Sequence, residues 1–227
     1  MQAITYILID LDNTLYPASS AMYAEIDRRM TDYVARLLEV PIGEAALIRR
    51  TCRDKFGSTL GGLVAQYDFS DPDDFLDSVH PEDVARFLTR DSGLKTALSA
   101  LHQPMSVLTN SPQEHALRVL EYLGINECFE RIFDIRYNKF MGKPADALYR
   151  KVLTAIDRRA QEVLFVDDMP AYLEGFKRIG GRILLVQENV QRGPTPKSMA
   201  SIANIKELAG YLADSIADSA AESSQTT

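Results

Sequence analysis

Short apolar runs recur along the chain, and each gives way to polar residues. The first run extends from Ile4 to Ile9 and stops at Asp10. Later runs cover residues 105–108, 129–135, 162–166 and 182–186. Apolar runs of this length, rich in β-branched residues, are typical of buried parallel strands. Helical patterns separate them, so the sequence predicts an α/β fold in which helices flank a parallel sheet.

Residues 18–88 interrupt this alternation with a run of helices. Apolar residues at three- and four-residue spacing predict an amphipathic helix that begins after Ser19 or Ser20. Further helical segments are expected over residues 45–56, 59–67 and 71–79. We therefore expect a small helical domain at residues 18–88, inserted into an α/β core domain formed by residues 1–17 and 89–212.

The core pattern resumes with a helix expected at residues 92–101. The sequence Ser111-Pro112-Gln113-Glu114 then predicts a capping box that starts the next helix. Further helices are expected after the turn at residues 142–144, after Asp168, and at residues 205–212. Ser, Ala, Asp and Thr dominate residues 213–227, which predicts a disordered tail.

Composition narrows the class of protein. The chain has 227 residues and a net charge of −7, which disfavours general nucleic-acid binding because that needs a basic face. Cys52 and Cys128 are too few for a disulfide framework, and we expect both to be buried thiols in a reducing compartment. No run reaches the length of a membrane span, and the first strand follows Met1 directly. These features predict a cytoplasmic protein without a membrane partner.

Four sets of polar residues lie where predicted strands end or where a loop is expected at the same edge of the sheet. They are Asp10 with Asp12, Thr109 with Asn110, Lys143, and Asp167 with Asp168. Each set alone has an ordinary explanation, such as an Asx turn, a helix N-cap, a plain turn or a solvated strand end. Because a parallel sheet brings its strand ends to one edge, the four sets are expected to converge.

Such a set suits phosphoryl transfer. Asp10 is the candidate nucleophile, since a carboxylate can form an aspartyl-phosphate. Asp12 is the candidate acid that protonates the leaving alkoxide and the base that then deprotonates water. Thr109 and Asn110 are candidates for binding phosphate oxygens, and Lys143 for neutralising charge on the transferred group.

The same residues predict a magnesium site. Magnesium binds a few carboxylates together with water and substrate oxygens. Asp10 and Asp168 are the expected carboxylate ligands, with Asp167 beside them and the backbone carbonyl of Asp12 as a further candidate. The expected ligand of the whole site is a small phosphorylated molecule, bound together with Mg²⁺.

The order and type of these residues resemble the four motifs of the haloacid dehalogenase-like (HAD) hydrolases, of which Asp10-Leu11-Asp12-Asn13-Thr14 resembles the first. The resemblance implies a Rossmann-like core, magnesium-dependent phosphohydrolase chemistry, and a helical C1-type cap inserted after the first strand. A narrower resemblance, carried by residues 12–16, 55–63, 74–80 and 109–125, points to the pyrimidine 5′-nucleotidase branch. It implies a pyrimidine nucleoside monophosphate as substrate.

Two positions depart from the family pattern. Gly61 stands where the branch usually has a basic residue, which puts substrate preference in doubt. Tyr172 stands where relatives often have a carboxylate or Asn, so an outer contact of the metal is expected to be missing.

Other functions are compatible with part of the pattern. The substrate could instead be a sugar phosphate, phosphoglycolate or similar ester, and the motifs alone also allow a phosphomutase or a non-catalytic binding protein. A haloacid dehalogenase is disfavoured because those enzymes lack the acid that Asp12 supplies. His80 and His115 are interpreted as structural. Tyrosines at positions 16, 23 and 67 are expected to pack the cap on the core rather than to stack on a nucleobase.

Overall fold

A six-stranded parallel sheet forms the centre of the molecule. The computed structural model describes residues 3–188 and 199–214. Strand order across the sheet is β3-β2-β1-β4-β5-β6. The strands are β1 (Tyr6–Ile9), β2 (Met105–Leu108), β3 (Arg131–Phe133), β4 (Val163–Asp167), β5 (Arg182–Val186) and β6 (Ser201–Ile202). This arrangement confirms the predicted α/β, Rossmann-like fold.

Strand β1 lies in the middle of the sheet and is buried on both faces. It pairs with β2 through Ile7 opposite Met105, and with β4 through Ile9 opposite Val166. Alternate residues point to opposite faces, as the period of a strand requires. Ile7 and Ile9 join one apolar cluster, whereas Tyr6 and Leu8 join another. This double burial explains why the strand is continuously apolar up to its polar end.

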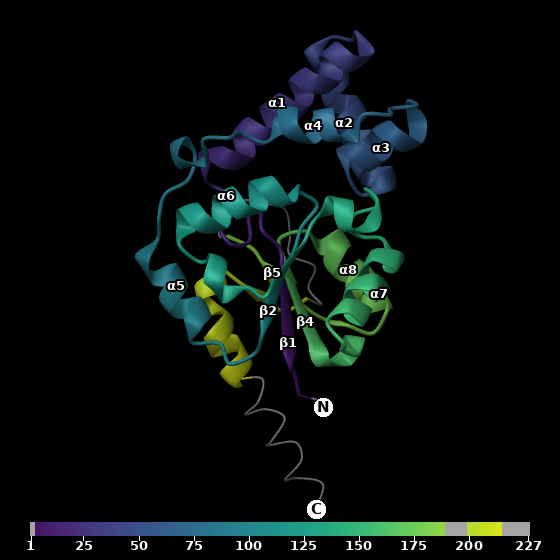
Figure 1. Ribbon diagram of the computed structural model, residues 1–227. Coiled ribbons are helices and arrows are strands. Elements are labelled where there is room, and N and C mark those ends of the chain that lie inside the picture. Colours follow the sequence, from purple (N-terminus) through teal and green to yellow (C-terminus); the bar gives the residue numbers. More distant parts are fainter. Residues whose placement is uncertain (1–2, 189–198, 215–227) are drawn as a thin grey trace, which may run out of the picture.

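Helices cover both faces of the sheet (Figure 1). They are α5 (Ser92–Ser99), α6 (Gln113–Leu123), α7 (Asp146–Ala155) and α8 (Pro170–Arg178). Helices α5 and α6 pack on the Ile7 face together with the stretch 205–212, and α7 and α8 pack on the Leu8 face. Short 3₁₀ turns join the elements: η1 (Val84–Arg86), η2 (Asn126–Cys128), η3 (Ile135–Asn138), η4 (Ala160–Glu162) and η5 (Ile205–Glu207).

Four further helices form a separate layer, which we call the α1–α4 layer. They are α1 (Ala21–Leu38), α2 (Ile42–Phe56), α3 (Thr59–Gln66) and α4 (Pro72–Val79). The layer lies beyond the carboxyl ends of the strands, above the sheet in Figure 1. It has its own apolar cluster, in which Tyr33 meets Phe75 edge to face at 5.1 Å between ring centroids. Burial of such side chains contributes about 1.5–3 kcal/mol each.

Several local predictions need correction. The expected capping box at Ser111 is wrong: α6 begins at Gln113 after Pro112, and the Ser111 hydroxyl bonds a side chain elsewhere. Ser20 precedes α1, but its side chain makes no capping hydrogen bond. The strand expected over residues 129–135 is shorter. The last helical stretch reaches residue 214, two residues into the predicted tail, and the rest of that tail lies outside the described residues.

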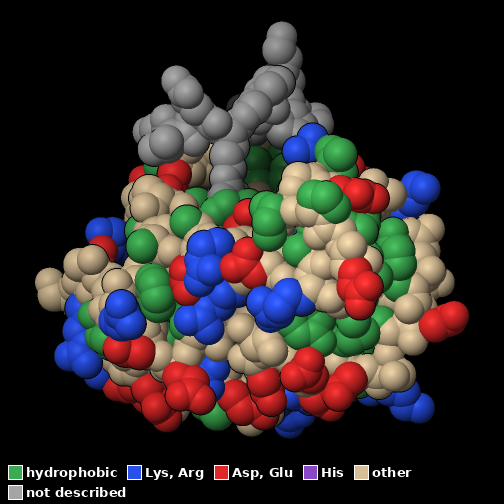
Figure 2. Space-filling view, turned by 90° about the horizontal axis from the view of Figure 1, so that it is seen from above, with side chains coloured by type: hydrophobic (Ala, Val, Ile, Leu, Met, Phe, Trp, Pro, Cys, Tyr) green, Lys and Arg blue, Asp and Glu red, His purple; other side chains and the backbone are tan. Residues whose placement is uncertain are grey.

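Seen from above, the face over the α1–α4 layer carries charged side chains of both signs mixed with apolar ones (Figure 2). Leu47 and Ile42 are among the apolar side chains that the structure leaves exposed. Among the described helices, none combines the length and the apolar character that a membrane crossing demands.

Candidate active site

Asp10 and Asp167 end adjacent strands and lie side by side. The backbone N–H of Asp10 continues the pairing of β1 with β4 by donating to the Val166 carbonyl at 2.9 Å. Both carboxylates are buried. The sheet therefore fixes their separation, since each follows an apolar strand that allows little movement.

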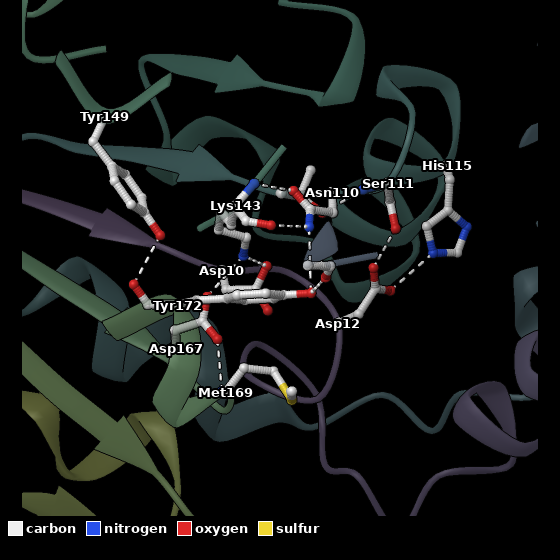
Figure 3. Close-up of polar contacts among 12 residues, drawn as sticks. Asp10, Asp12, Asn110, Ser111, His115, Lys143, Tyr149, Asp167, Met169 and Tyr172 are labelled. Atoms are coloured by element: carbon white, nitrogen blue, oxygen red, sulfur yellow. Dashed lines mark hydrogen bonds and ion pairs between the residues drawn. The ribbon is translucent and has the colours of Figure 1, made fainter. Parts of the chain in front are cut away.

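Lys143 joins these two carboxylates. Its ammonium Nζ donates to Asp10 Oδ1 at 2.6 Å and to Asp167 Oδ2 at 2.7 Å (Figure 3). The side chain is only 1% exposed, yet its pKa is raised above the ordinary lysine value. Burial alone would lower that pKa, but the two adjacent carboxylates outweigh it. Lys143 is therefore a permanent buried cation.

Asn110 sets the position of Lys143. Its Oδ1 accepts from the Lys143 backbone N–H at 2.7 Å, and its Nδ2 donates to the Lys143 carbonyl at 3.1 Å. The predicted role of Asn110 was phosphate binding. The structure instead engages both ends of its amide with the backbone that carries the lysine, so its contact with a substrate stays a prediction.

An acidic group suited to a metal ion surrounds the lysine. Carboxylate oxygens of Asp10, Asp167 and Asp168 lie within 4.8 Å of one another. Burial raises the pKa of Asp10 and of Asp167, neighbouring carboxylates raise it further, and Lys143 only partly opposes them. A divalent cation would supply the missing charge, and carboxylate oxygens are the ligands that Mg²⁺ prefers. The residues present therefore fit magnesium.

The members of this acidic group differ in how their oxygens are engaged. Asp167 accepts from Lys143 at Oδ2 and from the Met169 backbone N–H at Oδ1, at 2.7 Å in each case. Both of its oxygens thus already have donors. Asp167 is therefore a candidate for orienting Lys143, and Asp10 and Asp168 stay the metal ligands expected from the sequence.

Asp12 points away from the acidic group, toward three donors. Tyr16 Oη donates to its Oδ1 at 2.5 Å, His115 Nε2 lies 3.0 Å from the same oxygen, and Ser111 Oγ donates to Oδ2. Burial would raise the pKa of Asp12, but the charge and hydrogen bond of His115 and the two hydroxyl donors bring it below its usual range. The carboxylate is therefore fixed at the edge of the site.

Three residues of this group were not predicted from the sequence as functional. His115 lies in the first turn of α6, which begins where β2 ends, and that position is the signal that could have indicated it. His80 follows α4 and packs against His115, with ring centroids 4.7 Å apart and the rings tilted by 44°. Ser111, predicted as a helix cap, lies between His80 and Asp12.

Thr109 is buried at the end of β2. Its Oγ1 accepts from the Ser111 backbone N–H at 3.0 Å, which leaves the hydroxyl proton available to a bound oxygen. Thr109 also lines the cavity described next. The structure thus places it beside Asp10 and Asp12, as the sequence led us to expect.

A cavity of about 450 Å³ lies between the sheet edge and the α1–α4 layer. The sheet side contributes the acids, Thr109 and Lys143, and the layer side mixes apolar side chains with polar and charged ones such as Asp27, Arg49 and Arg53. The layer side includes Tyr23, Ile26, Met30, Leu60 and Phe75. Of the three tyrosines considered from the sequence, Tyr16 and Tyr23 line this cavity, whereas Tyr67 does not.

Tyr172 connects the core with the α1–α4 layer. Its hydroxyl donates to the Gly57 carbonyl at 2.8 Å and accepts from Asn110 Nδ2 at 3.3 Å. Its ring lies 5.0 Å from the Lys143 ammonium, and burial raises the pKa of its hydroxyl to about 12. Gly61, the second departure, lines a neighbouring cleft rather than this cavity. Where relatives often have a carboxylate or Asn, Tyr172 thus adds no charge and instead joins the core to the α1–α4 layer.

Fold and site together define a Rossmann-like α/β protein with a buried carboxylate–lysine centre at the carboxyl ends of its strands. A family model for haloacid dehalogenase-like hydrolases matches residues 4–180. The chain therefore belongs to the haloacid dehalogenase-like hydrolases.

Solved structures share the fold at low sequence identity. A 2-haloacid dehalogenase from Pseudomonas syringae is 20% identical, with 93% of this chain and 99% of that chain covered and a TM-score of 0.59. An HAD phosphatase from Thermococcus onnurineus is 19% identical, with coverages of 93% and 98% and a TM-score of 0.60. A putative HAD hydrolase from Bacillus subtilis, bound to magnesium, is 15% identical, with coverages of 93% and 99% and a TM-score of 0.60. Both dehalogenases and phosphatases thus share this architecture.

Proposed function

We propose that this hydrolase is a magnesium-dependent phosphomonoesterase, and that pyrimidine nucleoside monophosphates are its leading substrate class. The observation that carries the proposal is the Asp12 carboxylate, held by three donors at the same cavity as Asp10. Ester cleavage expels an alkoxide, which is a strong base and needs a proton. A halide is a weak base and needs none. A positioned second acid therefore favours phosphate esters over haloacids.

The reaction follows from these positions. Asp10 attacks phosphorus, the bond from phosphorus to the ester oxygen breaks, and Asp12 gives its proton to the departing oxygen. Water then attacks the aspartyl-phosphate, Asp12 takes a proton from that water, and Asp10 is released with inorganic phosphate. When bound, Mg²⁺ would balance the charge of the phosphoryl oxygens. Lys143 keeps the Asp10 carboxylate oriented during both steps.

Asp12 must hold a proton for the first step, although its surroundings favour the carboxylate. A substrate brings a phosphate dianion into the same cavity. Negative charge nearby disfavours a second negative charge, so the bound substrate raises the pKa of Asp12. Proton donation is then tied to substrate binding.

The α1–α4 layer is proposed to act as the cap over this chemistry. It supplies one wall of the cavity, and its Gly57 carbonyl accepts a hydrogen bond from Tyr172 of the core. A cover that excludes water protects the aspartyl-phosphate until the leaving group has departed.

The cavity wall formed by the layer supports a nucleotide substrate. Its apolar and aromatic side chains, among them Tyr23 and Phe75, suit the face of a nucleobase, and polar side chains beside them, such as Arg53 and Thr59, suit the polar edge of a base or the hydroxyl groups of a ribose. The cytoplasmic location and the absence of a nucleic-acid partner stay predictions of the sequence.

Phosphate release from a panel of esters tests the proposal. The panel contains uridine, cytidine and purine monophosphates, a sugar phosphate and phosphoglycolate, each with and without Mg²⁺. We expect magnesium-dependent release that is fastest with the pyrimidine nucleotides. Asp10→Asn should abolish turnover and leave the circular dichroism spectrum unchanged. Asp77→Asn, the same substitution at an exposed position of α4, is the matched control.

Three other results of this panel would favour a different substrate or a different function. Faster release from another ester would keep the chemistry and discard the nucleotide. Transfer of phosphate between positions of a sugar phosphate, without release, would favour a mutase. No turnover of any ester by folded, magnesium-loaded protein would refute the phosphatase and favour a binding protein.

A further inference from the structure

Two segments connect the α1–α4 layer to the core, and one contacts Asp12 directly while the other contacts it through Ser111. Tyr16 lies in the first segment, between β1 and α1, and its hydroxyl donates directly to Asp12. His80 lies in the second, immediately after α4, where the chain returns to the core. The acid–base carboxylate thus lies between the two connections that determine where the layer sits.

His80 is fixed by the end of α4. Its Nδ1 lies 2.8 Å from the Leu76 carbonyl in the last turn of that helix. A carbonyl only accepts hydrogen bonds, so Nδ1 carries the proton. Burial holds the pKa of His80 near 3, so the ring is neutral and its Nε2 is an acceptor. The helix therefore fixes both the orientation and the tautomer of the imidazole.

Ser111 relays this orientation to Asp12. His80 Nε2 lies 3.2 Å from Ser111 Oγ, and the same oxygen bonds Asp12 Oδ2. The hydroxyl has one proton, which it donates to Asp12 Oδ2 when that carboxyl is ionised. When Asp12 holds a proton, the carboxyl can donate it to Oγ, and the hydroxyl is then free to donate to His80 Nε2. His115 contacts both ends of this chain of residues. Its ring packs against His80, and its Nε2 lies 3.0 Å from Asp12 Oδ1.

We propose that His80 is a positioning residue that couples the placement of the α1–α4 layer to the carboxyl of Asp12 through Ser111. The inference rests on the proposed phosphatase activity and deepens it. A shift of α4 moves the Leu76 carbonyl and the imidazole with it, so Ser111 and Asp12 shift as well. The acid is then in place only when the layer is correctly docked over the cavity.

Two substitutions separate the two nitrogen contacts. In His80→Asn the side-chain amide can replace Nδ1 and keep the bond to Leu76, but it does not extend to Ser111. In His80→Gln the longer amide places a polar atom near the position of Nε2 and restores the contact with Ser111. His102→Asn, at an exposed histidine, is the matched control.

The assay compares two esters with different needs for a proton. An alkyl ester, the best nucleotide of the panel, expels an alkoxide and depends on Asp12. p-Nitrophenyl phosphate expels a stable phenolate and depends on it far less. We expect His80→Asn to lower kcat about tenfold on the alkyl ester and less than about twofold on the aryl ester, with KM for each within about twofold of wild type. His80→Gln should recover most of the loss, and His102→Asn should behave as wild type.

Double substitution supplies a second readout. Ser111→Ala should show the same selectivity between esters, and combining it with His80→Asn should add little, because both interrupt one chain of contacts. Equal loss of kcat on both esters, or His80→Gln as impaired as His80→Asn, would overturn the inference and leave the phosphatase standing. If wild-type protein turns over neither ester, the proposed function is wrong and the inference is wrong with it.

Discussion

A neutral buried histidine makes the protein sensitive to acid, and His80 allows the size of this effect to be worked out. The pKa of its imidazole falls from 6.5 to about 3. The main cause is burial, which disfavours the charged ring, and the neighbouring His115 adds to it. Asp12 and the Leu76 carbonyl act in the opposite direction but do not compensate.

Whether acid raises or lowers the free energy of unfolding depends on which state, folded or unfolded, binds the proton. Above pH 6.5 the ring is neutral in both the folded and the unfolded chain, so the depressed pKa has no effect on stability. As the pH falls below that value, the imidazole binds a proton in the unfolded chain but stays neutral in the folded chain. Stability then decreases until the pH reaches the folded pKa. Between pH 7 and pH 5 this one group lowers the free energy of unfolding by about 2 kcal/mol.

Urea unfolding of wild type and His80→Gln at pH 7, 6 and 5 measures this contribution. The carboxylates titrate in both proteins, so the difference between the two pH profiles isolates the imidazole. Between pH 7 and pH 5 we expect the free energy of unfolding of His80→Gln to fall by about 2 kcal/mol less than that of wild type, whatever its value at pH 7. His102→Gln, at an exposed position, should keep the wild-type slope. Parallel profiles for wild type and His80→Gln would refute the view that His80 is held neutral by burial.

Three further substitutions test the site and its connection to the α1–α4 layer. Lys143→Met should lower the free energy of unfolding by about 3–5 kcal/mol in urea, because it leaves buried carboxylates unpaired, and Mg²⁺ should restore part of the loss. Unchanged stability would contradict the buried ion pair. Asp168→Asn should weaken Mg²⁺ binding at least about tenfold by isothermal titration calorimetry while the fold is kept, and an unchanged affinity would remove it from the metal site. Gly57→Ala should cost about 1–3 kcal/mol and reduce kcat, since φ is +81° and a Cβ would lie 2.5 Å from Pro144 Cδ. Gly124→Ala is its control, with φ +70° and no atom within 4 Å, so it should cost stability alone.

The sheet and the convergence of its polar ends could be predicted because both depend on local sequence. An apolar run that ends in acids marks a strand end, and parallel pairing brings such ends to one edge. Asp10 and Asp167 meet for this reason, although they are far apart in sequence, whereas Lys143 reaches them from the loop before α7. Family membership was predictable on the same residues, and the family comparison confirms it.

The contacts around Asp12 could not be predicted in the same way. His80 reaches the site only because the chain returns from α4 beside α6, and no local pattern specifies that approach. Asn110 was assigned to phosphate from its place after β2, whereas its amide geometry matches the backbone of Lys143. The residue types were informative, but the choice among their polar partners is made by tertiary packing.

The two walls of the cavity come from separate parts of the chain. One wall is the sheet edge, assembled from the ends of several strands, and the other is a single uninterrupted stretch between β1 and β2. Mutations in that stretch can reshape what enters the cavity without touching Asp10 or Lys143. Selection can therefore vary the lining of the cavity while the sheet-edge residues stay the same, and recombination can exchange the α1–α4 layer as one block. Its two connections carry Tyr16 and His80, so a transplanted layer would need those contacts to work on this core.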